Sequence, residues 1–414
     1  MAVGLLKMKI PLISYHTSPA GLRMVHLHVK GCAVGYCGVA VKVGSRDESA
    51  QGLAHFVEHT IFKGTGKRSS WHIINRMEAV GGELNAYTTK EETVVYSAFP
   101  SGNLSRAAEL IADLVCNSQF PERELEKERE VVADEIDSYL DTPSEAVFDD
   151  FEDLLFAGSS IGHNILGNRT SLDTFTSDMC RDYLHRWYVP GNMVVFYAGA
   201  QSPDRVFAQL EKAFAPLSGP VPVRTERIPK VVRPFAMHKE IDSHQCHTVM
   251  GTRTGGFDAH ERYSLALLTN ILGGPGMNSL LNVALRERRG LVYSVEASTG
   301  IFSDCGEFVV YYGCDPDDNE RCRKLVESTI TSVADGYMTS RRLEAAKKQY
   351  LGQLIIASEN MENRILGIAR QLLFRGHVIP SSEVAEAIKA VTPEEIATLA
   401  STFTSPSYLT LGPK

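Results

Sequence analysis

A proline-rich segment near the middle of the chain constrains its fold more than any other feature. This segment, Gly219–Pro234, reads GPVPVRTERIPKVVRP and carries four prolines. Because proline fixes the backbone and lacks an amide donor, this density favours extended chain over helix. We therefore predict a linker over residues 219–234, between one domain over residues 1–218 and a second over residues 235–414. A chain of 414 residues suits two hydrophobic cores better than one.

The regions on either side of this linker have a similar predicted order of elements. Each is expected to begin with a strand, which two helices follow. Further strand-like sequence and then long helices come next, and a last strand ends the region. The strand-like runs are short and do not alternate regularly with helices, as they would in a parallel sheet. The sequence therefore predicts an α+β protein with two structurally similar domains. Each would be a mainly antiparallel sheet packed by helices, and the two would face each other across a ligand-binding cleft.

The composition excludes several classes of protein. Hydrophobic residues make up 43% and charged residues 22%, as in an average globular protein rather than a disordered chain or a collagen-like fibre. The net charge of −8 argues against a nucleic-acid partner, and no apolar run is long enough to span a membrane. The apolar run in Met1–Pro11 is too short for a secretory signal, and the eight scattered cysteines form no CxxC pair. We expect a cytoplasmic protein whose cysteines are small buried hydrophobic residues.

The pattern with the clearest chemical meaning is the pentapeptide His55–His59, which reads HFVEH. The surrounding apolar residues have helical spacing, so His55 and His59 lie one above the other on a helix and both can reach one metal ion. Glu58 shares that face, where its carboxylate can meet a water molecule at the metal. This order is the inverse of the commoner HExxH zinc signature. The alternative is a hydrogen-bonded histidine pair at the surface, and a third ligand would favour the metal site.

A candidate third ligand lies in Pro121–Leu140, which has a helix-starting proline, acids in its early turns and an apolar stripe. Glu128 and Glu135 are seven residues apart and therefore lie on one side of this helix. One of them can bind the metal while the other orients a ligand. The alternative is a solvated acidic face, which we expect for the early acids of the helix. Glu135 differs from these because its neighbours include Val131 and Ile136.

These residues resemble the pattern of the M16 metallopeptidases, the inverzincins. In that family HxxEH precedes two glutamates, and the spacings match, since Glu135 follows His59 by 76 residues and Glu128 stands seven residues before Glu135. The resemblance implies that His55, His59 and Glu135 bind Zn2+. It also implies that Glu58 is the general base and that Glu128 supports the ligands. Three further motifs extend the resemblance over the first half: Lys63–Thr65 (KGT), Gly81–Thr88 (GGELNAYT) and Tyr188–Met193 (YVPGNM).

The second half lacks HxxEH, and its equivalent helix, near Tyr263–Leu268, offers no metal ligands. Its Gly-rich loop, Gly273–Ser279, could be read as a phosphate-binding loop, but it lacks both the GKS/T ending and a GxGxxG frame. The family resemblance implies that Arg286 and Tyr293, seven residues apart, bind the substrate backbone near the scissile bond. A guanidinium suits a peptide carbonyl, and a phenol can donate to a developing oxyanion. Without the first-half motifs, a surface arginine and a half-buried strand tyrosine would explain this pair.

An exposed sheet edge is predicted where Gly81–Thr88 precedes the strand-like run Thr93–Ala98. An extended peptide can add to such an edge as an extra strand, through main-chain hydrogen bonds that make few demands on its sequence. The resemblance places Asn85 and Ala86 on this edge as substrate-binding residues. Asn85 can equally be a turn residue after the two glycines.

Together these features predict a zinc-dependent metalloendopeptidase that hydrolyses short or unfolded peptides inside an enclosed chamber. Glu58 would be the general base, and Arg286 and Tyr293 would complete the catalytic residues. The chain has the length of the two-domain M16 members. Because it contains both the metal motif and the Arg286/Tyr293 pair, we expect a homodimer. The alternatives are a non-catalytic scaffold or a metal-binding subunit of an M16-like assembly.

Overall fold

Residues 12–224 and 229–413 are described by the computed structural model, and they divide into two units. Both Met1–Pro11 and part of the predicted linker (residues 225–228) lie outside the described residues. Among the described helices, none is both long and apolar enough to cross a membrane. The first unit contains residues 12–136, 165–224 and 358–378, and the second unit contains residues 137–164, 229–357 and 379–413.

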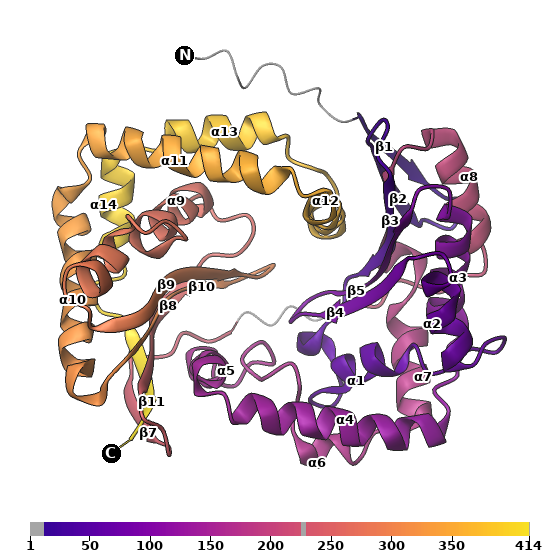
Figure 1. Ribbon diagram of the computed structural model, residues 1–414, viewed down its shortest axis with the longest axis horizontal. Helices are drawn as coiled ribbons and strands as arrows, with labels where there is room; N and C mark the ends of the chain where they lie inside the picture. Colours follow the sequence, from indigo (N-terminus) through magenta and orange to yellow (C-terminus); the bar gives the residue numbers. More distant parts are fainter. Residues whose placement is uncertain (1–11, 225–228, 414) are drawn as a thin grey trace. The chain divides into compact units, whose positions relative to one another are not determined.

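The first unit is built on a six-stranded sheet in the order β1-β2-β6-β3-β5-β4 (Figure 1). β2 and β6 are parallel, and every other neighbouring pair is antiparallel. β4 therefore forms one edge of the described sheet and pairs with β5. The strands are β1 (Leu12–Thr17), β2 (Arg23–His28), β3 (Val34–Val41), β4 (Glu83–Thr88), β5 (Thr93–Pro100) and β6 (Met193–Gly199).

Both faces of this sheet are covered, because successive side chains of a strand point to opposite sides. In β6, Val195 and Tyr197 belong to a core that includes residues of α3 and α8, whereas Val194 and Phe196 pack in a second core with α12. This double burial explains why β6 reads as a nearly continuous apolar run. The helices of this unit are α1 (Leu53–Thr60), α2 (Ser70–Glu78), α3 (Leu104–Asn117), α4 (Glu122–Leu140, which continues into the second unit), α6 (Arg169–Leu172), α7 (Ser177–Trp187), α8 (Pro203–Phe214) and α12 (Met361–Arg375), with short turns η1 (Ser45–Asp47) and η2 (Pro190–Asn192).

The second unit repeats this arrangement with five strands. Its sheet has the order β7-β11-β8-β10-β9, which matches β2-β6-β3-β5-β4 in chain order and in the direction of every pair. Helix α9 packs against the edge strand β9 as α1 packs against β4. The strands are β7 (Ala236–Glu240), β8 (Cys246–Thr254), β9 (Val292–Ile301), β10 (Gly306–Cys314) and β11 (Ser407–Gly412). The helices are α5 (Pro143–Leu155), α9 (Arg262–Gly273), α10 (Asn319–Ser332), α11 (Ser340–Ser358), α13 (Ser381–Ala390) and α14 (Pro393–Ser401), with shorter segments η3 (Asn282–Glu287), η4 (Pro316–Asp318) and η5 (Val333–Tyr337).

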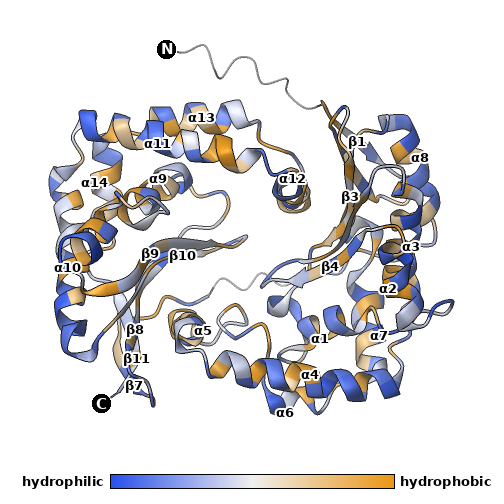
Figure 2. Cartoon of the chain, viewed as in Figure 1, coloured by the Kyte–Doolittle hydropathy of each residue, from blue (hydrophilic) through white to orange (hydrophobic). Residues whose placement is uncertain are grey.

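Each sheet takes one covering helix from the other half of the sequence. α12 follows the linker in sequence, yet its Ile365 and Ile368 pack with strands β2, β3 and β6 of the first unit. α5 precedes the linker, yet its Val147 and Phe151 pack with β8 and β11 of the second unit. Figure 2 shows apolar residues concentrated along α12 and along the strands that it covers. The spatial units therefore do not follow the order of the chain.

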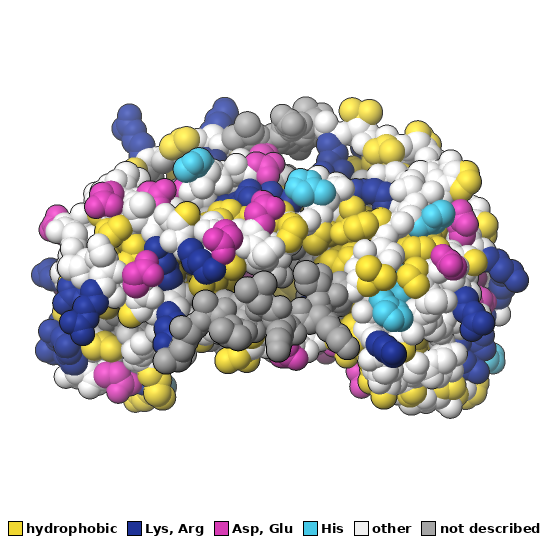
Figure 3. All heavy atoms as spheres, turned by 90° about the horizontal axis from the view of Figure 1, so that it is seen from above, with side chains coloured by type: hydrophobic (Ala, Val, Ile, Leu, Met, Phe, Trp, Pro, Cys, Tyr) yellow, Lys and Arg dark blue, Asp and Glu magenta, His cyan; other side chains and the backbone are white. Residues whose placement is uncertain are grey.

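The prediction of an α+β protein with two similar sheets packed by helices is confirmed, although each sheet contains one parallel pair. The sequence predicts that the second helix of the second half begins at Asn278, whereas the structure forms helix only from Leu280, which leads into the π-helical segment η3. All eight cysteines are free, and six of them are buried. Figure 3 shows acidic and basic side chains interspersed over the face that it presents.

Candidate metal centre

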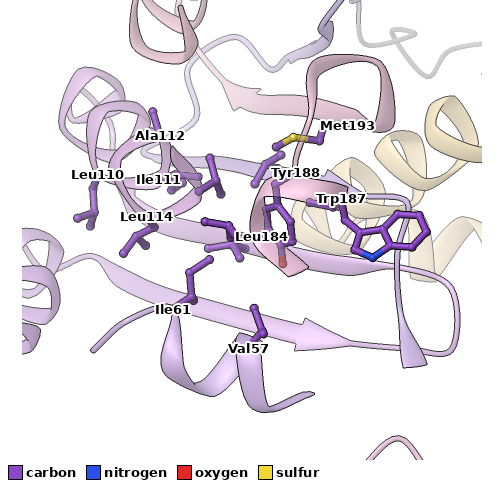
Figure 4. Close-up of a cluster of buried hydrophobic side chains, with 14 of the residues drawn as sticks. Val57, Ile61, Leu110, Ile111, Ala112, Leu114, Leu184, Trp187, Tyr188 and Met193 are labelled. Carbon is purple, nitrogen blue, oxygen red and sulfur yellow. The ribbon is translucent and has the colours of Figure 1, made fainter. Parts of the chain in front are cut away.

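Helix α1 carries the pentapeptide HFVEH and is fixed by a core that it shares with α3 and α7. Val57 of α1 and Ile61, which directly follows this helix, lie in the same buried cluster as Leu110 of α3 and Leu184 of α7 (Figure 4). All four side chains are almost completely inaccessible to solvent. Because protein cores are close-packed, this contact leaves the helix little freedom to shift. The polar residues of the pentapeptide are therefore presented from a rigid element.

Glu48 holds the N-terminus of α1. One oxygen of its carboxylate accepts a hydrogen bond from the Gly52 amide at 2.7 Å, and the other accepts from Ala54 at 2.9 Å. These first-turn amides have no partner within the helix, so the carboxylate satisfies them. Burial raises the pKa of Glu48 to about 8, although the same hydrogen bonds oppose the rise. Sequence reasoning missed this residue, even though an acid shortly before a helix is a usable signal.

A glycine is required where α1 begins. Gly52 has a φ of 90°, which residues with a side chain rarely adopt. A Cβ at this position would also lie 2.6 Å from the carbonyl oxygen of Leu166. The loop that contains Leu166 thus packs directly against the start of the helix. This contact gives a structural role to part of the segment His163–Gly167.

Three potential metal ligands come together on α1 and α4. One ligand atom from each of His55, His59 and Glu135 lies within 4.8 Å of the others. Oε2 of Glu135 is 3.7 Å from Nε2 of His55 and 3.4 Å from Nε2 of His59. The two imidazole rings have centroids 4.5 Å apart and planes inclined at 64°. Two imidazole nitrogens and one carboxylate oxygen are the donors of many catalytic zinc sites, which keep a further position open.

Glu128 lies behind His59 and outside the three-residue cluster. Its Oε1 is 3.0 Å from His59 Nδ1, and its Oε2 is 2.6 Å from Lys63 Nζ. An ionised carboxylate only accepts hydrogen bonds, so His59 donates to Glu128 through Nδ1–H, and its Nε2 faces Glu135. Burial acts to raise the pKa of Glu128, but the hydrogen bonds from His59 and Lys63 outweigh burial and hold that pKa below its usual value.

The two histidines differ in their affinity for a proton. Burial, with a smaller contribution from His59, lowers the pKa of His55 to about 3, so His55 is neutral at physiological pH. Burial also acts to lower the pKa of His59, but the hydrogen bond to Glu128 and the charges of Glu58 and Glu135 raise it overall. Metal binding requires neutral imidazole, and a bound cation takes the place of the proton on His59. The neutral His55 nitrogen and the surrounding carboxylates therefore fit a divalent cation.

Glu58 lies next to this cluster. Burial raises its pKa, while the charge of His59 and a hydrogen bond from Thr88 partly offset that rise. Thr88 is the last residue of β4, so the edge strand ends close to the carboxylate on α1. A carboxyl group in such a half-buried position can accept and return a proton during a reaction.

The predicted sheet edge is present in the described structure. Asn85 and Ala86 lie in β4, opposite Tyr96 and Val95 of β5, and both are partly exposed. β4 is therefore a strand with one free side, adjacent to α1. The role of Asn85 and Ala86 in binding substrate stays a prediction.

The predicted substrate pair lies in the second unit. Arg286 is an exposed residue of η3, and Tyr293 is the second residue of the edge strand β9. The Tyr293 side chain is 73% exposed, so it contributes little to the core and is not a half-buried strand tyrosine. Contact between this pair and a substrate at the metal stays a prediction.

The apolar surroundings expected for Glu135 are wrong. Val131 is 52% exposed, and the side chain of Glu135 is 43% exposed. The two residues are four apart and share one face of α4, whereas Val132 and Ile136 lie on the buried face. Val131 is a neighbour of Glu135 in sequence, but it does not bury the Glu135 side chain. Exposure leaves the Glu135 carboxylate accessible to a metal ion from solvent.

Solved structures share this architecture. A peptidase M16 inactive domain from Pseudomonas fluorescens has a TM-score of 0.89 at 18% identity and covers 97% of this chain and 98% of its own. A protease from Helicobacter pylori has a TM-score of 0.87 at 21% identity, over 98% of this chain and 100% of its own. The fold is therefore the two-unit architecture of these proteins.

Sequence comparison gives the family. The model for insulinase, peptidase family M16, matches residues 24–169, and the model for the peptidase M16 inactive domain matches residues 174–350. A Mycobacterium leprae protein named as an uncharacterized zinc protease is 34% identical, over 96% of this chain and 91% of its own. The Bacillus subtilis protein YmxG, which bears the same description, is 31% identical over 94% of this chain and 95% of its own. The chain belongs to peptidase family M16.

Proposed function

We propose that the protein is a zinc-dependent endopeptidase whose metal is held by His55, His59 and Glu135. The observation that carries this proposal is the convergence of their ligand atoms within 4.8 Å, beside the half-buried carboxylate of Glu58. Membership of family M16 and the naming of relatives as zinc proteases support it. A passive scaffold would need neither the donor set nor the adjacent base.

The chemistry follows from the positions of these residues. A zinc ion bound there would polarise a peptide carbonyl and acidify a water molecule. Glu58 accepts the proton from the attacking water and returns it to the leaving amine. Thr88 lies close enough to the Glu58 carboxylate to favour its ionised form. Glu128 keeps His59 in the tautomer whose Nε2 can bind a metal.

The substrate class follows from the edge strand. We expect an extended peptide to pair with β4, along Asn85 and Ala86, through main-chain hydrogen bonds. Such pairing needs an unfolded segment and makes few demands on its sequence, so the proposed substrates are short or unfolded peptides. In this proposal the peptides are cleaved in an enclosed chamber, and Arg286 and Tyr293 bind the peptide near the scissile bond.

We further propose a homodimer, because one chain supplies both the metal residues and the Arg286/Tyr293 pair. Light scattering on the purified full-length protein measures its mass in solution. A mass of about twice 45.6 kDa supports the proposal, and a monomer at micromolar concentration contradicts it.

The substitution Glu58→Gln tests the catalytic assignment. It removes the base but retains the size of the side chain, so cleavage of an unstructured fluorogenic peptide should fall by about 10²- to 10⁴-fold. Zinc content, measured by elemental analysis, should stay at the wild-type level. Glu126→Gln, which changes an exposed acid of α4, is the matched control and should leave both unchanged. The proposal would be contradicted if Glu58→Gln cleaved the peptide as fast as the wild type does. It would also be contradicted if the wild-type protein kept its activity in excess chelator.

A further inference from the structure

A lysine beyond the metal cluster makes a short contact with the carboxylate that supports His59. Lys63 Nζ lies 2.6 Å from Glu128 Oε2, and the other oxygen of Glu128 lies 3.0 Å from His59 Nδ1. The Glu128 side chain is 8% exposed and that of Lys63 is 26% exposed. The three residues therefore form a continuous chain from a half-buried ammonium to an imidazole of the metal cluster.

The segment that carries Lys63 is held in place on its C-terminal side. The hydroxyl of Thr65 donates to the buried carboxylate of Asp113 at 2.8 Å, and Arg68 also binds Asp113. The amides of Lys67 and Arg68 donate to the Thr65 hydroxyl. A lysine on a flexible loop would lose side-chain entropy on forming an ion pair, but here the backbone is already ordered. Lys63 is thus directed at Glu128 by its surroundings.

We propose that Lys63 is a positioning residue for the metal site, and that it acts through Glu128 on His59. This inference rests on the proposed zinc site. The ammonium binds one oxygen of Glu128 and leaves the other directed at His59, which fixes the rotation of the carboxylate. The fixed carboxylate orients the imidazole and keeps its Nε2 directed at the metal position. Three carboxylates lie around the two histidines, those of Glu58, Glu128 and Glu135. The positive charge of Lys63 offsets the negative charge of one of them, Glu128.

The competing explanation is an ordinary ion pair that contributes only to folding. Such an ion pair can contribute to folding without any effect on a metal site. A folding role would change the thermal midpoint of the metal-free protein and leave its zinc affinity alone. A positioning role changes zinc affinity, because groups that orient a metal ligand typically contribute about 10- to 100-fold to it. The two roles are therefore separable by experiment.

The experiment measures the zinc dissociation constant of the full-length protein by competition with a chromophoric chelator. Lys63→Met keeps the length of the side chain without its charge and should weaken zinc binding by about 10-fold or more. Lys63→Arg, which retains a donor for Glu128, should restore most of the affinity. Lys67→Met, an exposed lysine of the same loop, is the matched control and should bind zinc as the wild type does. Equal affinity of Lys63→Met and the wild type would overturn the inference.

A double substitution tests whether Lys63 acts through Glu128. If it does, Lys63→Met combined with Glu128→Gln should bind zinc no more weakly than Glu128→Gln alone. Additive losses would show that Lys63 acts by another route, and would overturn the inference. His59→Ala separates this result from the proposed function. If His59→Ala still binds one zinc ion tightly, the zinc site itself is refuted. If His59→Ala loses zinc but Lys63→Met binds zinc with wild-type affinity, only the role of Lys63 is refuted.

Discussion

Helices α1 and α9 occupy equivalent places in two sheets of the same topology, but they carry different side chains. α1 packs against the edge strand β4 and presents two histidines and a glutamate. α9 packs against the edge strand β9, and its buried residues include four leucines and no histidine or acid. The fold therefore does not need a metal ion at this place, since the second unit forms it without metal ligands in α9. The polar residues of α1 are better explained by chemistry than by stability.

The largest effect expected in the second unit concerns Tyr293. If its exposed phenol donates to the oxyanion, Tyr293→Phe should lower kcat by about 10²-fold, as the loss of an oxyanion donor does elsewhere. Zinc content should not change, because Tyr293 belongs to the unit without the cluster. Steady-state kinetics on an unstructured peptide measure this effect, and Tyr263→Phe in α9 serves as a control. Unchanged kinetics would mean that the second unit is only a structural partner.

The next effect concerns acid stability, in which the two units should differ. His26 of β2 is fully buried, and burial, together with the charge of His28, lowers its pKa to about 4. The unfolded chain, with an ordinary histidine pKa near 6.5, then binds a proton more readily than the folded chain does. The stabilising contribution is therefore present above pH 6.5 and is lost as pH falls toward 4, by up to about 3 kcal/mol.

The measurement is chemical unfolding at pH 7 and pH 5, with hydrogen exchange to separate the units. His26→Phe should reduce the loss of stability between these two pH values. His247 of β8 is the comparison in the second unit, because burial lowers its pKa too but it keeps a hydrogen-bond contact with Tyr311 at 2.9 Å. The same pH dependence in His26→Phe and the wild type would contradict the prediction.

The smallest effect concerns the two helix caps. Glu48→Ala leaves two amides of α1 without their acceptor, which should cost about 2 kcal/mol of unfolding free energy and weaken zinc binding. In the second unit, Glu395 makes an exposed cap on α14 by accepting from the Thr392 amide. Glu395→Ala should cost about 1 kcal/mol or less and leave zinc binding unchanged. Equal effects of the two substitutions on zinc affinity would show that the position of α1 does not depend on Glu48.

Local patterns predicted much of the fold and of the site. The four-residue spacing of His55 and His59 placed both on one face of a helix. The edge at Gly81–Thr88 was predicted from its place before a strand-like run, and the family resemblance placed Asn85 and Ala86 on it. The similar order of elements in the two halves predicted two similar sheets, which the matching strand orders confirm. These features depend on residues close together in sequence, where helical and strand periodicities apply.

Contacts between distant residues were not predictable in the same way. Nothing in the periodicity of α12 or α5 shows that each covers the sheet of the other half of the chain. The exposure of Val131 depended on how α4 is rotated about its axis, which tertiary packing sets. Lys63 was visible only as part of a motif, since its partner Glu128 lies far along the chain.

The sequence by itself determined which residue types are spaced to bind a metal and which half of the chain carries them. The tertiary structure decided that Glu135 joins the two histidines while Glu128 lies behind His59. It also decided that Glu48 and Lys63 contact the site from outside the pentapeptide. The physical reason is the distance along the chain over which each kind of contact is determined. Helical spacing fixes neighbours within a turn or two, but the rotation and approach of separate helices follow from the packing of their whole buried surfaces.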